Sequence, residues 1–553
     1  MPGRRSLIRH AFQMIGLAAA CAAPAVAQPD VTHQEIQDTI QYTAVGTTRA
    51  YAWGSYTCNI GNQSLSWING GTPALAMNAY RLHNGRMLQI GLGFAKHSCC
   101  VANGGGCGTC STSGFGLRPG CRDIYGAGFN GGQGRLGPRS GINPFTRTFA
   151  TIPSATGDST FRRVQVKTPD LSPVTFANAQ YFAEGVYVCS EETLATSMNN
   201  ATYRRHTVAN TGTNPTYNWT GVGTGQVGKG AIYAWKDHGL GANIPDPNMY
   251  IENVDVPGEG RFVIAGKVIA QGNGTWQYEY AVFNLNSHRS GGSFTIPLPA
   301  NASVNNVFFH SPNYHSGEAY SNTAWTSQRT SQGITWNSPQ SFAQNPNSNA
   351  LRWGTMYNFA FTSDAPPAGA LGEASLGLFR PGTPTSIQMP GVPVPCVSPT
   401  IDTQPQLTQG CPCSRIEMSV QAVTGGNTNF RWQRETFPGS GVFENVSDTS
   451  GNACGSGLVG TGTAVLSVTG LTAAEGGLYR CQITSPCGDV TTESALLDVC
   501  IGDFNCDGAA EGSDVEAFFI AWENGEPLAD TDASGGIDGS DVQAFFIRWS
   551  NGC

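Results

Sequence analysis

Short stretches of alternating apolar and polar residues recur from residue 28 to about residue 380, and Gly, Asn and Pro turns separate them. This pattern predicts β strands rather than helices. The clearest pair of strands, 261–270 and 275–285, lies on either side of a Gln-Gly-Asn-Gly turn and predicts a β-hairpin. Further strands are expected at 293–296, 304–309, 333–336 and 356–361. We therefore expect residues 28–380 to form a large β-sandwich-type domain in a mainly β protein.

Two stretches depart from this pattern. Residues 104–141 are rich in Gly, contain several Cys and show no periodicity, which predicts a long loop region pinned by disulfides. Residues 381–395 have the sequence PGTPTSIQMPGVPVP, which predicts a proline-rich linker.

Residues 396–500 show a second kind of β pattern. Trp432 follows a Gly-Gly-Asn turn on a predicted third strand, and Tyr479 stands two residues before Cys481. A core Trp and a Tyr at this position are features of immunoglobulin sandwiches. The segment resembles bacterial immunoglobulin-like domains over its whole length. Val420 occupies the second-strand position that usually holds the partner of Cys481, so we expect the usual inter-sheet disulfide to be missing.

Residues 503–514 and 530–541 are two copies of one twelve-residue pattern. Each copy has oxygen-bearing side chains at positions 1, 3, 5, 9 and 12 and a Gly at position 6. Ca²⁺ prefers oxygen ligands, Gly allows the sharp turn, position 7 supplies a carbonyl and position 9 usually acts through water. The predicted calcium ligands are Asp503, Asn505, Asp507, Ala509, Glu511, Asp514, Asp530, Asp532, Ser534, Gly536, Asp538 and Asp541.

The segments after the two loops are also copies. Both place apolar residues at i, i+3, i+4 and i+7, as on one face of a helix: Val515, Phe518, Phe519 and Trp522, then Val542, Phe545, Phe546 and Trp549. Two such loop–helix units resemble a dockerin, the small module that docks enzymes onto cohesin scaffolds. The resemblance covers residues 501–553 and implies a calcium-binding, EF-hand-type tail with a cohesin-like or other surface partner.

Two features of the tail modify this resemblance. Gly512-Ser513 and Gly539-Ser540 stand where cellulosomal dockerins usually hold hydroxyl-rich pairs, which puts a cohesin partner in doubt. The closing Asn-Gly-Cys resembles tails that anchor secreted proteins of some aquatic bacteria. The tail also contains eleven carboxylates and one Arg, whereas the whole chain has a net charge of −8. Its acidity is therefore a local feature of the predicted metal loops.

The N-terminus predicts export. Residues 1–27 combine a basic start, a short apolar run and an Ala-Val-Ala site, as in a secretory signal peptide. Arg4-Arg5 leaves a twin-arginine signal open as an alternative to an ordinary one. No other apolar stretch is long enough to span a membrane, so we expect a secreted protein. The low charge, at 12% of residues, and the absence of a basic run argue against a nucleic-acid partner.

The cysteines agree with an extracellular location. Without Cys21 the chain keeps sixteen, an even number suited to disulfides. A bridge from Cys411 or Cys413 to Cys487 is expected in the immunoglobulin-like segment. Because dockerin-like modules bring their ends together, the resemblance also implies a bridge between the tail's two cysteines, Cys506 and Cys553.

The large domain has no recognisable catalytic motif. His310, His315 and Glu318 could share a metal on one loop, but loop histidines making hydrogen bonds are the more common case. Cys107-Gly-Thr-Cys110, near His97, could suggest metal or redox chemistry, but disulfides are favoured in an exported protein.

A row of aromatic residues is the remaining candidate. Trp276, Tyr278 and Tyr280 share one strand face, which could stack on sugars but more often belongs to a core. Glycoside hydrolysis would need two facing carboxylates, and the sequence cannot pair its scattered acids, which include Asp123, Glu184, Glu252, Asp255, Glu259 and Glu279.

Two functions follow as hypotheses. The first is a non-enzymatic extracellular protein with a docking tail, working in surface attachment or assembly. The alternative is a polysaccharide-acting glycoside hydrolase or carbohydrate-binding protein that carries a dockerin. The sequence does not tell whether the chain is an enzyme, and it does not identify a ligand for the domain formed by residues 28–380.

Overall fold

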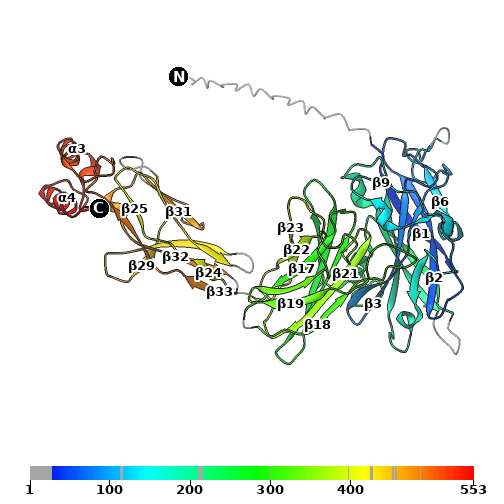
Figure 1. Ribbon diagram of the computed structural model, residues 1–553. Helices are drawn as coiled ribbons and strands as arrows, with labels where there is room; N and C mark the ends of the chain where they lie inside the picture. Colours follow the sequence, from blue (N-terminus) through cyan, green and yellow to red (C-terminus); the bar gives the residue numbers. More distant parts are fainter. Residues whose placement is uncertain are drawn as a thin grey trace, which may run out of the picture.

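The computed structural model describes residues 28–552 except 112–115, 210–215, 301, 397, 424–427, 451–453, 455–456 and 486. The predicted signal segment 1–27 and Cys553 lie outside the described residues. The described chain is mainly β with a small helical tail, as predicted. Figure 1 shows its parts in a row, with the first sheet at one end and the tail at the other. Within the described ranges, no helix is long and apolar enough to cross a membrane.

The N-terminal part is one large antiparallel sheet that curls until its first and last strands approach each other. The Gly225 amide of the last strand donates to the carboxylate of Glu35 on the first strand at 3.0 Å. The strands follow the order β1 (Val31–Gln41), β2 (Thr48–Asn59), β10 (Val164–Lys167), β4 (Arg86–Leu92), β3 (Ala74–His83), β11 (Gln180–Val188), β12 (Ala201–Ala209) and β13 (Asn218–Val227). The short strands β5 (Ala95–His97), β6 (Arg122–Tyr125) and β7 (Leu136–Gly137) also belong to this sheet. A separate pair is formed by β8 (Ile142–Asn143) and β9 (Thr148–Phe149), and two short helices are α1 (Ala127–Asn130) and α2 (Ala234–Asp237).

Two five-stranded sheets follow and pack face to face. One contains β14 (Tyr250–Asp255), β15 (Arg261–Ala270), β16 (Trp276–Asn284), β21 (Thr355–Ser363) and β18 (Asn305–His310). The other contains β19 (Thr326–Thr330), β20 (Gly333–Asn337), β17 (Gly291–Pro297), β22 (Gly372–Leu378) and β23 (Ser386–Val392). The predicted hairpin is confirmed as β15–β16, and the four further strands predicted are β17, β18, β20 and β21.

The sheet that contains β16 is buried on both faces. Successive residues of a strand point to opposite faces, so Tyr278 and Tyr280 enter the core between the two five-stranded sheets. Ala281 and Phe283 enter a different core, shared with the large curled sheet. Residues 28–380 therefore contain the expected sandwich, and the curled sheet adds a further layer that packs on one of its two sheets.

The stretch predicted as a linker belongs to this sandwich. Residues 386–392 form β23, which pairs with β22 along its length. Met389, Val392 and Val394 are fully buried. The prediction of a linker over 381–395 is therefore wrong, because apolar residues between the prolines complete the core, and an edge strand tolerates Pro.

The immunoglobulin-like segment has the expected core. Trp432 and Tyr479 are both fully buried, and the Tyr479 hydroxyl donates to Glu475 O at 2.8 Å. This contact is the tyrosine corner of immunoglobulin folds. Cys481 is buried and forms no disulfide, while Val420 stands opposite in the core, so the predicted absence of the usual bridge is confirmed.

This segment has two main sheets. One contains β25 (Thr408–Gly410), β34 (Ala495–Val499), β32 (Gly477–Ser485), β28 (Asn429–Glu435) and β29 (Phe443–Asn445), with β33 (Gly488–Thr491) beside β32. The other contains β26 (Ile416–Ser419), β31 (Val465–Thr469) and β30 (Gly457–Val459). A separate pair is β24 (Thr400–Thr403) with β27 (Gln421–Val423).

Disulfides pin both halves of the chain, which is consistent with an oxidising, extracellular environment. The bonds that join two described cysteines are Cys58–Cys107, Cys110–Cys121, Cys396–Cys487, Cys411–Cys506 and Cys413–Cys454, and Cys500 is disulfide-bonded as well. The first two hold the Gly-rich loop region, as predicted. The expected bridge from Cys411 or Cys413 to Cys487 is wrong. The chain entering the domain runs beside the β32–β33 turn, where Ser398 Oγ donates to Cys487 O at 2.7 Å, and this brings Cys396 to Cys487.

Candidate metal loops and other sites

The two C-terminal loops repeat the same hydrogen bonds. In the first loop, the amides of Asp507 and Gly508 donate to the two oxygens of Asp503 at 2.9 and 3.0 Å. In the second loop, the corresponding amides of Ser534 and Gly535 donate to Asp530, each at 2.9 Å. These residues lie 27 positions apart in the chain, so the duplication of the sequence is also a duplication of the backbone path.

The last position of each loop is held in the same way. Asp514 accepts from the amides of Asn505 and Glu511 at 3.0 and 2.8 Å. Asp541, its counterpart, accepts from Asp532 and Asp538 at 3.2 and 2.8 Å. Both carboxylates are fully buried at the start of a helix, α3 (Gly512–Glu523) and α4 (Gly539–Asn551).

Three carboxylates converge in each loop. Their nearest oxygens lie within 4.8 Å of one another in two groups, Asp503 with Asp507 and Asp514, and Asp530 with Asp532 and Asp541. Unpaired carboxylates at this separation repel one another, and a divalent cation between them removes that cost. Oxygen-only donors suit a hard cation such as Ca²⁺. The residues therefore fit the predicted ion.

The Gly at position 6 is required by the backbone. Gly508 and Gly535 have φ angles of 95° and 86°, a region that side chains with a Cβ avoid. The amide of each Gly and that of the residue before it donate to the first Asp of the loop. The remaining predicted ligands, Asn505, Ala509, Glu511, Ser534, Gly536 and Asp538, lie in the same loops and stay predictions. Glu511 and Asp538 also cap α3 and α4.

The tail does not stand alone. Phe518 of α3 stacks on Phe545 of α4 with ring centroids 4.3 Å apart, and Phe504 packs edge-on against both. These rings join the core of the immunoglobulin-like segment, to which Tyr479 also belongs. Arg548 of α4 adds an ion pair with Asp498 at 3.6 Å.

A disulfide reinforces this junction and corrects a prediction. Cys506 of the first loop is bonded to Cys411, with Cα atoms 5.4 Å apart, so the bridge expected between Cys506 and Cys553 is wrong. Cys411 directly follows β25, which pairs in parallel with β34. The tail begins where β34 ends, so its first loop meets Cys411.

The histidines of the large domain serve its backbone. His310 Nε2 contacts Gln89 O at 2.9 Å and His315 Nε2 contacts Leu92 O at 2.7 Å. Glu318 accepts from the Arg139 amide at 2.7 Å. Burial lowers the pKa of His315 to about 4, so the ring stays neutral. Among the described residues, these three do not converge on one metal position.

The other candidates in this domain are divided between core and surface. His97 Nδ1 contacts Gly70 O at 3.0 Å, and both cysteines of the Cys-x-x-Cys stretch are in disulfides. Tyr278 and Tyr280 are fully buried, so the aromatic row belongs to the core and not to an exposed sugar platform. Trp276, at the strand's end, is half-buried.

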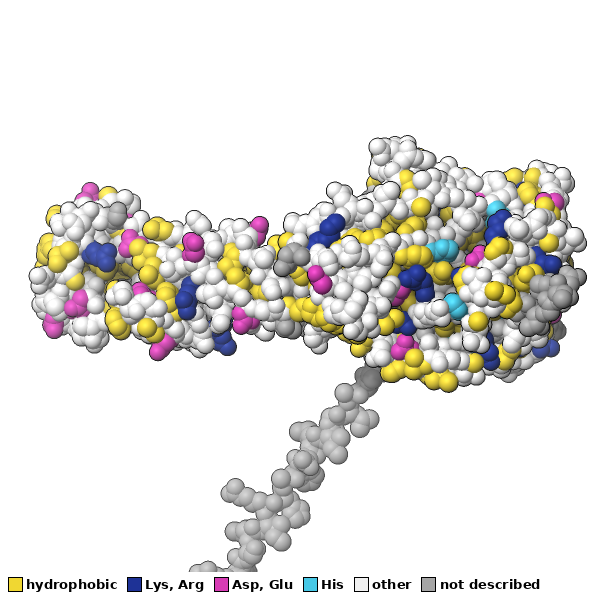
Figure 2. All heavy atoms as spheres, turned by 90° about the horizontal axis from the view of Figure 1, so that it is seen from below, with side chains coloured by type: hydrophobic (Ala, Val, Ile, Leu, Met, Phe, Trp, Pro, Cys, Tyr) yellow, Lys and Arg dark blue, Asp and Glu magenta, His cyan; other side chains and the backbone are white. Residues whose placement is uncertain are grey.

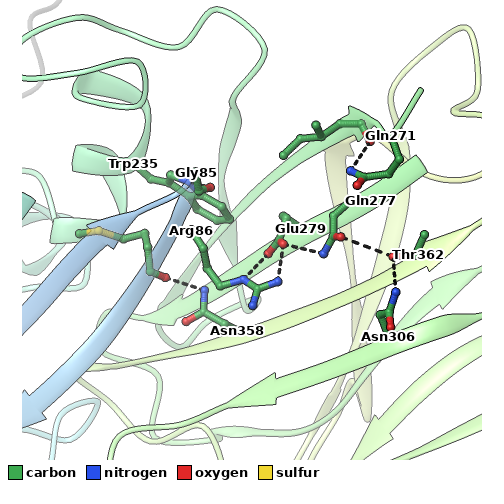
Figure 3. A network of polar contacts seen from close by, with 11 residues as sticks. Gly85, Arg86, Trp235, Gln271, Gln277, Glu279, Asn306, Asn358 and Thr362 are labelled. Carbon is green, nitrogen blue, oxygen red and sulfur yellow. Dashed lines mark hydrogen bonds and ion pairs between the residues drawn. The ribbon is translucent and has the colours of Figure 1, made fainter. Parts of the chain in front are cut away.

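Glu279 lies on the opposite face of β16 from Tyr278 and Tyr280 and faces an open cleft between the curled sheet and the sandwich, beside the β3–β4 turn. Arg86 Nε donates to Glu279 Oε2 at 2.8 Å, its Nη2 contacts Oε1, and Gln277 Nε2 donates to Oε1 at 2.8 Å. Figure 3 shows this network continuing through Thr362 to Asn306. The sequence analysis missed this pairing, because 193 residues separate Arg86 from Glu279.

The cleft has a volume of about 430 Å³. Its walls carry planar polar side chains and two half-buried phenyl rings. Arg86 Cζ lies 4.0 Å from the centre of the Phe308 ring, and Arg81 Cζ lies 3.4 Å from that of Phe176. Arg81 is also paired with Asp170 at 2.9 Å. The positive charges of the walls are therefore balanced.

Four of the other candidate acids of this domain each have a donor of their own. These pairs are Asp123 with the Ala102 amide, Glu184 with Tyr80, Asp255 with Arg261, and Glu259 with Ser287. Glu252 lies on β14. Burial raises the pKa of Asp123 to about 6.

No family model matches the chain, and no curated protein matches it. Several solved structures match a small part. A titin M4 domain is 17% identical, covers 18% of this chain and 94% of its own length, and has a TM-score of 0.14. A titin M3 domain is 14% identical, covers 18% of this chain and 95% of its own length, and has a TM-score of 0.15. A Dpr1 IG1 domain bound to DIP-eta IG1 is 15% identical, covers 18% of this chain and 94% of its own length, and has a TM-score of 0.14. The immunoglobulin-like assignment made above rests on the core residues and sheet order.

Proposed function

We propose that this chain is an exported, mainly β protein whose C-terminal tail is a dockerin-like module that binds two Ca²⁺ ions and attaches the protein to a surface or assembly partner. The observation that carries the proposal is the convergence of three carboxylates in each of two loops with identical hydrogen bonds. Secretion is supported by the disulfides, which form and persist in oxidising compartments.

Exposed apolar side chains on both helices of the tail support a docking role. Ile520 of α3 and Phe546 and Ile547 of α4 are 55%, 37% and 52% exposed. In Figure 2 hydrophobic side chains lie at the surface of this end of the molecule, among scattered acidic ones. Exposed apolar residues on two helices held by metal loops offer a partner such as a cohesin-like protein a contact area. The shared core and the Cys411–Cys506 bond present this surface rigidly.

Attachment is tested with the mature chain and surface material from the producing cells. We expect at least tenfold weaker retention when calcium is chelated, and the same loss for Asp514→Asn with Asp541→Asn. A matched control, Glu516→Gln with Glu523→Gln, removes two exposed charges outside the loops and should be retained like the wild type. Retention of the loop variant at wild-type strength would contradict the proposal.

The cleft favours a second candidate function, carbohydrate binding without hydrolysis. Planar polar side chains around aromatic rings suit a neutral, hydroxyl-rich ligand, since they provide both donors and acceptors while the rings contact the sugar's C–H face. Among the described residues that line the cleft, Glu279 is the only carboxylate, and three donor groups engage it. Hydrolysis would need a second carboxylate across the bond.

An array of neutral oligosaccharides, including β-linked glucans, xylans and mannans, tests this candidate on the mature chain. We expect binding that Gln277→Ala or Phe308→Ala weakens at least tenfold, with no release of reducing sugar. Gln328→Ala, an exposed glutamine on β19, is the control. The candidate fails if nothing on the array binds, or if the cleft variants bind like the control.

A further inference from the structure

Two adjacent cysteines remain outside the disulfides of the described residues. Cys99 and Cys100 follow β5 at the start of the Gly-rich loop region, the first half-buried and the second exposed. Their sulfur atoms lie 2.7 Å apart. Non-bonded carbon atoms keep about 3.5–4.0 Å between them, and sulfur is the larger atom. Two separate thiols do not share this space, whereas a covalent bond between them brings the sulfurs to about 2.05 Å.

The backbone on both sides of the pair is fixed. Ser98 N donates to Pro73 O at 2.9 Å, and Ser98 Oγ donates to Thr72 O at 2.7 Å. On the other side, the Tyr125 hydroxyl donates to Cys100 O, and Cys100 N contacts the same hydroxyl at 3.4 Å. The two sulfurs therefore lie together on an anchored segment, and closing a bond between them orders little additional chain.

Other described cysteines do not compete for this pair. The next two in the chain, Cys107 and Cys110, are bonded to Cys58 and Cys121. Cys189 is fully enclosed in the core of the curled sheet. Each sulfur of the pair therefore has the other as its nearest partner.

We propose that Cys99 and Cys100 form a disulfide with each other in the exported protein, closing an eight-membered ring at the surface that reductants can open. In the forming step, one thiolate attacks the disulfide of an exported protein thiol oxidase and gives a mixed disulfide. The neighbouring thiolate then displaces the oxidase sulfur. The two cysteines lose two protons and two electrons, and the oxidase disulfide becomes a dithiol.

The two buried cysteines, Cys189 and Cys481, are expected to stay thiols for the same chemical reason. Disulfide exchange needs a thiolate with access to its target. Burial raises the pKa of Cys481 to about 11 and raises that of Cys189 as well. Cys189 and Cys481 therefore remain buried thiols and do not bridge the two halves of the chain.

The test is mass mapping of the full mature chain after export. The protein is denatured with N-ethylmaleimide and no reductant, then digested so that cleavage separates Val101 from Cys107. We expect label on Cys189 and Cys481, none on Cys99 or Cys100, and a fragment lighter than its dithiol form by two hydrogen atoms. Mild reduction of the native protein before labelling should add label at Cys99 and Cys100 first, because that ring is exposed.

A single substitution distinguishes this ring from other pairings. In Cys99→Ser, Cys100 has no neighbour to bond and should become labelled, while the other disulfides stay intact. Cys99→Ser with Cys100→Ser controls for loss of the side chains and should leave the remaining map unchanged. Label on both cysteines of the wild type, or either one joined to a third cysteine, would overturn the proposal.

Discussion

Removing calcium from the mature chain is expected to unfold the tail while leaving the β-sheets folded. Each loop contains four carboxylates, which repel one another without a cation. A ligand that binds only the folded state stabilises it by about 2.7 kcal/mol at a hundred times its Kd, so two sites give roughly 5 kcal/mol. Hydrogen exchange should show protection of α3 and α4 falling at least a thousandfold in chelator, with peptides from β21 as the internal control.

Two comparisons make this prediction specific. Asp514→Asn should lose about half of the calcium-dependent protection, whereas Glu516→Gln should keep all of it. Magnesium should restore little, because it requires tighter octahedral geometry. Equal protection of both helices with and without calcium would show that the loops do not need a cation. The Cys411–Cys506 bond and the shared core keep the tail attached, so the experiment needs the full chain rather than an isolated tail.

The largest effect of a single substitution is expected at Arg139. This side chain is fully buried, and its guanidinium donates to Gly93 O, Gly354 O, Met77 O and Asn78 Oδ1 at 2.7–3.0 Å. Gly354 precedes β21 of the sandwich, while the other three acceptors belong to the curled sheet. The guanidinium therefore ties the two units together.

The charge of Arg139 is balanced within the same network. Asn78 Nδ2 donates to Glu184 at 2.6 Å and to Gly354 O at 2.9 Å, and the Tyr80 hydroxyl donates to Glu184 at 2.7 Å. Burial raises the pKa of Glu184, while hydrogen bonds and Arg139 oppose this shift. Removing the guanidinium takes the donor away from Gly93 O and Asn78 Oδ1 and takes the neighbouring positive charge away from Glu184, which keeps its hydrogen bonds from Asn78 and Tyr80.

Arg139→Met should therefore lower the free energy of unfolding of the N-terminal units by at least about 3 kcal/mol, since each buried acceptor left unpaired costs about 1–3 kcal/mol. Arg139→Lys should recover only part, because one ammonium cannot replace a planar fork of donors. Urea titration, monitored by hydrogen exchange of peptides from β3 and β21, measures the decrease in the free energy of unfolding. Arg205→Met, a half-buried arginine of β12, is the control. A change within 0.5 kcal/mol of that control, roughly the range of surface substitutions, would contradict the role.

Local signals predicted the local structure well. The Gln-Gly-Asn-Gly turn sets the register of β15 and β16, and the spacing of Trp432 and Tyr479 identifies the immunoglobulin-like core. The 27-residue repeat predicted two equivalent loops, and the structure brings Asp503 to Asp514 and Asp530 to Asp541. In each case the residues that determine the geometry lie close together in the sequence or repeat at a fixed interval.

Contacts between distant segments were not predictable in the same way. The double-sided burial of β16 depends on a sheet formed by other parts of the chain, so its alternation alone could not show a third layer. The Cys411–Cys506 bond depends on where the tail meets β25, and the Arg86–Glu279 pair depends on how the β3–β4 turn meets the sandwich. The proline content suggested a linker at 381–395, but the segment pairs with β22 as strand β23 and buries Met389 in the sandwich core.

Calorimetric titration of the decalcified mature chain with CaCl₂ tests the central claim most directly. The account predicts two bound Ca²⁺ ions per chain, one ion for Asp514→Asn or Asp541→Asn alone, and no binding when both are replaced. Glu516→Gln should still bind two. Absence of binding heat in the wild type at several temperatures, or an unchanged stoichiometry in the loop variants, would contradict a tail built on two calcium sites.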